Sequence, residues 1–168
     1  MGTDYLSAFE SSAMGTTTVH VTSSGSFPGT LAEIVDEPAV GTPLPFEEVS
    51  LDDTPVAVDP SPTAVRDAAT GVTPAGLGIA DYGTVTLPSR ETPDEVVALY
   101  PVRHVAVVAK SDIVGDMPAA YERLSEEFAG GLDTQILATG PSTTADMGAL
   151  VEGVHGPQET DVIVLEDR

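Results

Sequence analysis

The residue types best suited to chemistry gather near the C-terminus, in the stretch 140–156. Hydroxyl side chains and a carboxylate follow a Gly-Pro pair, and one of only three histidines stands at the far end. The candidate ligand-binding residues here are Gly140, Ser142, Thr143 and Thr144, with Asp146, His155 and Gly156 in support. The apolar residues between them recur at helical spacing, so the sequence predicts a helix within 142–154.

A hydroxyl-rich turn at the start of a helix can bind a carboxylate or a phosphate. The first backbone N–H groups of a helix lack partners and carry the positive end of its dipole. Plain helix capping by Ser142 or Thr143, with Asp146 in the first turn, accounts for the same residues, so both interpretations stand. His155 would lie about 15 Å or more from Ser142 along such a helix, too far for a nucleophile and its base. His155 can equally well cap the helix C-terminus.

A second candidate group is the segment "IADYGT" at 79–84. Asp81 could act as a carboxylate beside a glycine turn, although a turn aspartate that bonds its own backbone is the simpler hypothesis. We expect Asp81, Gly83 and Thr84 to form one wall of a crevice, with the 139–146 turn as the other wall. Open α/β sheets bind ligands at the carboxyl edge of the strands, which places this crevice there.

No metal or cofactor site is predicted. The chain has no cysteine, which excludes Cys-ligated zinc and iron–sulfur clusters within it. No two histidines are close in sequence, and His20 and His104 stand in predicted strands without an evident role.

Acidic residues dominate the charge of the chain. There are 27 Asp and Glu against 6 Lys and Arg, a net charge of −21, and Lys110 is the only lysine. The acids are dispersed, which is typical of a surface adapted to high salt, so we expect a halophilic source. Nucleic acid is not an expected partner because clustered cations are missing. The absence of a long apolar stretch and of a signal-peptide pattern predicts a cytoplasmic protein with no membrane segment.

Strands and helices alternate along most of the chain. Strands are predicted over 16–22, 56–59, 83–87, 102–109, 133–139 and 160–167. Helices are predicted over 4–12, 31–35, 62–70, 117–129 and 142–154. The candidate N-caps are Thr30, Ser61 and Asp116, and Gly71 is expected to end the helix over 62–70. The pattern indicates one α/β domain over 1–168, with 1–15 as a short N-terminal extension. We expect an open, mostly parallel sheet with helices on both faces.

Three segments resemble the LUD domain (lactate utilisation) family, in particular its LutC (YkgG-like) branch. They are "IADYGTVTL" at 79–87, "YPVRHVAVVAKSDIV" at 100–114, and "GPSTTADM" with "VEGVHGP" within 140–157. The resemblance extends roughly from Gly71 to Glu166. Tyr82 is a departure, because the family usually has a small hydroxyl residue there.

The resemblance implies a fold like that of the NagB/RpiA/CoA-transferase group. It also implies a role beside iron–sulfur partner proteins in oxidising L-lactate to pyruvate, without a redox cofactor of its own. One alternative is an autonomous transferase- or isomerase-like enzyme, or a binding protein, for a small phosphorylated or CoA-linked metabolite. A structural or regulatory interaction module is the other alternative, since fold likeness alone does not establish activity.

The charge generates a prediction about salt. Stability should rise with KCl up to molar concentrations and collapse below a few tenths molar, because repulsion among the acids is then unscreened. Thermal melting across a KCl series measures this. A melting temperature independent of KCl would contradict the halophilic interpretation.

Overall fold

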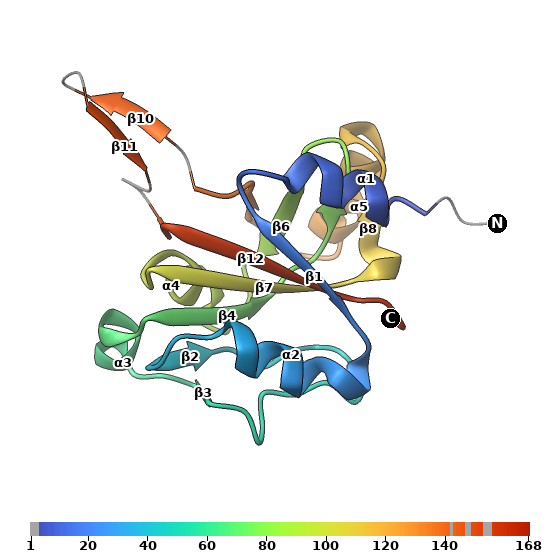
Figure 1. The fold of residues 1–168 in the computed structure, drawn as a ribbon. Helices are drawn as coiled ribbons and strands as arrows, with labels where there is room; N and C mark the ends of the chain where they lie inside the picture. Colours follow the sequence, from blue (N-terminus) through green and yellow to red (C-terminus); the bar gives the residue numbers. More distant parts are fainter. Residues whose placement is uncertain (1–3, 142, 147–148, 153–155) are drawn as a thin grey trace.

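A six-stranded parallel sheet forms the centre of the molecule (Figure 1). The computed structural model describes residues 4–141, 143–146, 149–152 and 156–168. In spatial order the strands are β1 (Thr18–Thr22), β12 (Glu159–Leu165), β7 (Arg103–Ala109), β4 (Thr70–Pro74), β2 (Ala39–Gly41) and β3 (Val56–Val58). Every neighbouring pair is parallel. The predicted open, parallel α/β sheet is therefore confirmed.

Strand β7 lies in the middle, as the sequence predicts for 102–109. It pairs with β12 on one edge and with β4 on the other, and all its residues after Arg103 are buried. Short apolar β-branched runs suit such a position because both of their faces must be covered.

A second, four-stranded sheet was not predicted. Its order is β8 (Ile113–Val114), β5 (Gly78–Ile79), β6 (Thr84–Pro88) and β9 (Gln135–Ala138), with parallel and antiparallel pairs. The predicted strands 83–87 and 133–139 are present, but they belong to this sheet. The glycine-rich stretch 71–82 supplies strands as well as turns.

Helices flank the main sheet. They are α1 (Leu6–Ala13), α2 (Phe27–Ile34), α3 (Pro62–Asp67), α4 (Asp94–Leu99) and α5 (Met117–Ala129), with short 3-10 turns at Ser24–Ser26 and Lys110–Asp112. The N-caps predicted at Ser61 and Asp116 are confirmed, because the Ser61 side chain accepts from the Ala64 N–H and the Asp116 side chain from the Ala119 N–H. Helix α2 starts earlier than predicted: Thr30 lies inside it, where its hydroxyl bonds the Ser26 carbonyl.

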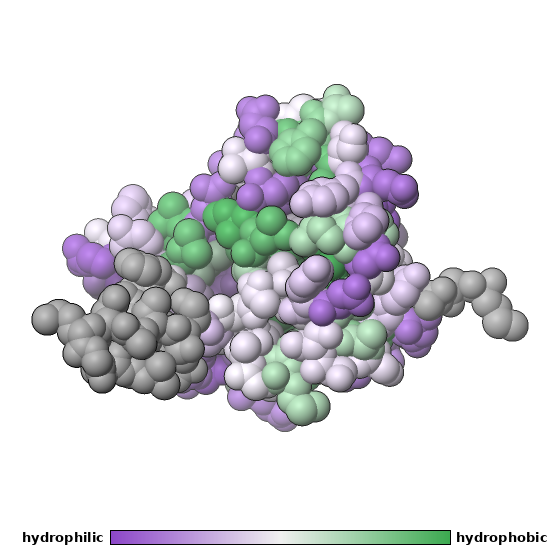
Figure 2. All heavy atoms as spheres, turned by 90° about the horizontal axis from the view of Figure 1, so that it is seen from above, coloured by the Kyte–Doolittle hydropathy of each residue, from purple (hydrophilic) through white to green (hydrophobic). Residues whose placement is uncertain are grey.

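Two cores fill the space on the two faces of the main sheet. On one face α2 and the 42–55 loop cover Val105 and Ile163. On the other face α1 and the second sheet cover Ala106 and Val162. Phe9 of α1 is fully buried, so this part of the predicted N-terminal extension belongs to the core. From above, apolar patches lie among hydrophilic side chains (Figure 2). In the described part of the chain, no helix combines the length and apolarity that a membrane crossing requires.

The predicted helix within 142–154 is wrong. Residues Thr143–Asp146 form β10 and Ala149–Glu152 form β11, an antiparallel pair that projects away from both sheets (Figure 1). The β-branched Thr143, Thr144 and Val151 favour strands, and Gly148 between the two runs disfavours a continuous helix. Helical spacing over so short an apolar run does not distinguish a helix from a strand.

Gly71 sets the distance between α4 and the sheet. It was predicted to end a helix, but α3 ends at Asp67 and Gly71 lies in β4. A Cβ at Gly71 would lie 1.9 Å from the carbonyl oxygen of Val97 in α4. The backbone of α4 therefore lies directly on β4, and no side chain fits between them.

Gly71→Ala should lower the free energy of unfolding by about 3 kcal/mol or more, because the added methyl must displace helix backbone. Gly29→Ala is the matched control, since Gly29 is exposed in α2 and a Cβ there meets nothing within 4 Å. It should raise stability by about 0.5–1 kcal/mol. Urea unfolding at fixed KCl measures both, and equal effects would contradict this packing argument.

Candidate functional site

A pocket of about 180 Å³ lies between the two sheets and is here called the His104 pocket. Its walls are apolar side chains from β6, α4 and β9: Leu87, Ala98, Leu99, Ile136, Leu137 and Ala138. Its polar floor consists of His104 and Thr160. Its rim consists of Thr139, Gly140, Gly156 and Pro157. The described lining thus combines an apolar slot with an uncharged polar end.

His104 and Thr160 are neighbours on the floor because of strand register. Each is the second residue of its strand, and the two pair directly across β7 and β12. His104 is 2% exposed, and its Nε2 lies 2.9 Å from the Thr73 hydroxyl. Burial lowers the pKa of His104 from 6.5 to about 4. The imidazole is therefore neutral at pH 7 and offers one donor and one acceptor nitrogen.

Thr160 carries an unpaired hydroxyl. The residue is 6% exposed, and its buried Oγ1 has no hydrogen-bond partner among the described residues. Buried polar groups in folded proteins are nearly always paired, and an unpaired one costs free energy. This hydroxyl is therefore a candidate contact for a bound molecule.

The rim is fixed by contacts of Thr139 and Gly140. The Thr139 Oγ1 lies 2.8 Å from the Thr84 Oγ1, and the Thr17 hydroxyl donates to the Thr139 carbonyl at 3.3 Å. Gly140 has a φ of 114°, and a Cβ there would lie 2.8 Å from the Thr16 carbonyl oxygen. The Gly-Pro segment therefore needs glycine because it passes close to the chain that leads into β1.

Some predicted site residues come together here. Gly140 and Gly156 line the same pocket, and Thr84 reaches its rim through Thr139. The three family-like segments therefore converge, since His104 comes from the second of them.

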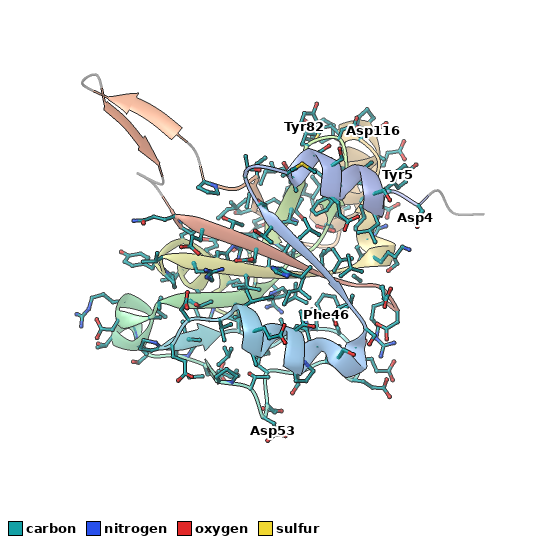
Figure 3. The ribbon with its side chains drawn as sticks, viewed as in Figure 1. Asp4, Tyr5, Phe46, Asp53, Tyr82 and Asp116 are labelled. Atoms are coloured by element: carbon teal, nitrogen blue, oxygen red, sulfur yellow. The ribbon has the colours of Figure 1, made fainter. Side chains whose placement is uncertain are left out.

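Asp81 and Gly83 are not among the described residues that line the His104 pocket. Asp81 is exposed in the turn between β5 and β6, where its N–H donates to the Gly115 carbonyl. Gly83 has a φ of 59°, and a Cβ there would lie 2.5 Å from the Ala13 nitrogen of α1. Tyr82, the departure from the family pattern, points outward beside α1, away from the projecting hairpin (Figure 3). Gly83 thus allows close packing against α1, and Asp81, Tyr82 and Gly83 are not among the described lining of the His104 pocket.

The remaining predicted residues belong to the 142–155 stretch. Ser142 and His155 lie outside the described residues, and Thr143, Thr144 and Asp146 are placed only as residues of β10. No helix starts at Thr143, so the prediction of an anion site at a helix N-terminus loses its basis.

The predicted place of this segment, at the carboxyl edge of the main sheet, is also wrong. Pro141 lines a second cavity, of about 340 Å³, together with Thr18, Arg103 and Glu159. These three are the first residues of β1, β7 and β12, so the cavity lies at the amino edge. The reason is that β9 belongs to the second sheet, so its carboxyl end does not share an edge with those of the parallel strands.

The second cavity is poorly suited to an anion. Arg103 pairs with Asp161 at 2.7 Å, with Asp36 at 3.3 Å, and with Glu159. The Nε2 of His20 also contacts Asp161, at 2.8 Å. Arg103 is the cation among the described residues that line the cavity, and its carboxylate partners outnumber it. Across the described residues, no group of three or more His, Cys, Asp or Glu could hold a metal ion.

Sequence reasoning missed the roles of His104 and Thr160. His104 is a polar residue followed by an apolar strand run, which is the signal that could have identified it, whereas Thr160 stands between Glu159 and Asp161 and gives no such signal. The sequence alone does not show that the strands carrying these residues pair with each other and place His104 opposite Thr160.

The fold and the converging segments define an α/β protein of the LUD type, and the sequence profile of the LUD domain matches residues 62–165. The chain belongs to the LUD domain family. It is similar to lactate utilization protein C of Bacillus licheniformis, with 41% identity over 93 residues that cover 53% of this chain and 39% of that protein. The same protein of Bacillus subtilis is 38% identical over 93 residues, again 53% and 39%. The matched region thus spans well under half the length of these relatives.

A solved structure supports the fold. A DUF162 family protein from Deinococcus radiodurans superposes with a TM-score of 0.75, with 96% of each chain covered and 22% sequence identity. At this identity the likeness concerns the fold alone.

Burial of His104 predicts a pH dependence of stability. The unfolded chain takes up a proton near pH 6.5, whereas folded His104 does so only near pH 4. The free energy of unfolding is therefore unaffected by His104 above about pH 6.5 and falls as the pH drops toward 4. At pH 5 the decrease amounts to about 2 kcal/mol.

His104→Asn should remove this part of the slope of unfolding free energy against pH. An NMR titration of the imidazole provides the direct measurement, with no protonation above about pH 5 expected. A His104 that titrates near 6.5 would show that it is not buried as described.

Proposed function

We propose that this chain is a LutC-like component of an L-lactate utilisation system, which supports oxidation of L-lactate to pyruvate together with iron–sulfur partner proteins. One observation carries the proposal: the segments that resemble the family converge on a single pocket. His104, Gly140 and Gly156 line it, and Thr84 supports its rim. The relatives that are named lactate utilization protein C match this chain at about two fifths identity.

In this proposal the redox chemistry belongs to the partners. The chain contains no cysteine and so supplies no thiolate for a cluster. Its own contribution is a binding pocket with a neutral polar floor and a rim held by hydrogen bonds between threonines. We expect it to act in the cytoplasm, as the sequence predicts.

The alternative, an autonomous enzyme for a phosphorylated or CoA-linked metabolite, loses its main support. That hypothesis relied on an anion-binding turn at a helix start, opposite Asp81. Thr143 begins a strand, and Asp81 lies in an exposed turn and is not among the described lining of the His104 pocket. None of the described residues that line the His104 pocket carries a cation that would hold a phosphate.

Deletion of the gene in its own organism tests the proposal. The deletion strain should fail to grow on L-lactate and stop consuming it, while growth on pyruvate, the product of the oxidation, is retained. Restoring the gene should restore growth. Normal growth and unchanged L-lactate consumption in the deletion strain would refute the role.

The partner assignment has its own measurement. The tagged full-length chain, purified from cells grown on L-lactate, should retain proteins that contain iron and acid-labile sulfide. Material from pyruvate-grown cells is the control. Absence of iron from the L-lactate sample would contradict the assignment.

A further inference from the structure

We propose that the His104 pocket binds an uncharged group, namely a hydroxyl, carbonyl or amide carried on a short apolar body. This assignment does not depend on the role in lactate utilisation. It rests on the floor, the charge and the walls of the pocket.

The floor provides an unsatisfied hydrogen-bonding group. The Thr160 Oγ1 is buried without a partner among the described residues, although a hydroxyl can donate one hydrogen bond and accept others. Its neighbour His104 already contacts Thr73 through Nε2. A hydroxyl, carbonyl or amide group of a ligand would satisfy Thr160 and remove the cost of burying it unpaired.

The described lining contains no cation that could pair with a negative charge. His104 is its one ionisable residue, and burial keeps that side chain neutral. Arg103 precedes His104 but engages Asp161 and Glu159, which are on the same side of the sheet as Arg103 itself. A carboxylate on the floor would lose its hydration without gaining an ion pair, which is costly.

The walls determine the body of the ligand. Leu87, Ala98 and Ile136 enclose the slot with hydrocarbon. A volume of about 180 Å³ exceeds the share of a single water and admits a branched group of a few carbons. Apolar contact with these side chains favours such a body, and the floor orients its polar end.

Isobutyramide and isobutyrate form a matched pair of probes, because they share shape and differ in charge. Each is titrated into the full-length protein at fixed KCl and followed by amide chemical shifts in NMR. Isobutyramide should give saturable shifts at His104, Thr160 and Gly156, with isobutyrate at least roughly tenfold weaker. Equal or tighter binding of isobutyrate, or the absence of saturable shifts with both probes, would overturn the proposal.

Two substitutions at one position test the floor. Thr160→Val keeps the shape but removes the hydroxyl, so isobutyramide should bind roughly tenfold more weakly while the melting temperature stays equal or rises. Thr160→Ser retains the hydroxyl and should bind within about threefold of the unaltered protein. If Thr160→Val binds isobutyramide unchanged, the hydroxyl is not the contact and the proposal fails. The comparison of the two probes on the unaltered protein needs neither variant.

Discussion

The rest of the structure depends on β7 being enclosed on all sides. Its two edges pair with β12 and β4, and both of its faces are covered, so each of its polar groups needs a partner inside the protein. Apolar side chains meet this condition at most positions. His104 is the polar exception after Arg103, and it meets the condition as a neutral imidazole bonded to Thr73 on the neighbouring strand. The same burial that stabilises the sheet thus sets the protonation state at the floor of the pocket.

Pairing along β7 also explains how distant segments meet. Strand β12 places Thr160 beside His104 and brings Gly156 and Pro157 to the rim. The second sheet supplies the opposite wall, and the 2.8 Å contact between the Thr84 and Thr139 hydroxyls ties β6 to the chain after β9. Close approach of α4 at Gly71 completes the enclosure. Each part of the pocket therefore follows from a packing contact that does not depend on a ligand.

The sequence predicted the parts of the fold whose local signals agree with their burial. The apolar runs at 102–109 and 160–167 became central strands, and Ser61 and Asp116 cap their helices as their types and positions predict. It failed where local pattern and tertiary pairing diverge. The 142–154 stretch has helical spacing, but its described residues pair as antiparallel strands. Strands β5, β6 and β9 belong to a second sheet and not to the main one. Of the residues that the structure places at the candidate pocket, Gly140, Gly156 and Thr84 had been singled out from the sequence motifs. Thr160 could not be found, because its importance comes from an unpaired atom and a register that only the fold provides.

Charge acts on the pocket at two ranges. Over long distances, 27 acidic residues against 6 basic ones repel any anion that approaches the protein. Within the pocket, the described hydrocarbon walls and neutral floor give a bound anion no opposite charge to offset its lost hydration. Salt separates the two effects. Molar KCl screens the long-range repulsion within a few ångström, whereas it leaves the cost of desolvating an anion in the pocket nearly unchanged. The proposed selectivity for uncharged groups therefore rests on the local construction of the floor, where Thr160 and His104 meet, and it should persist in molar KCl.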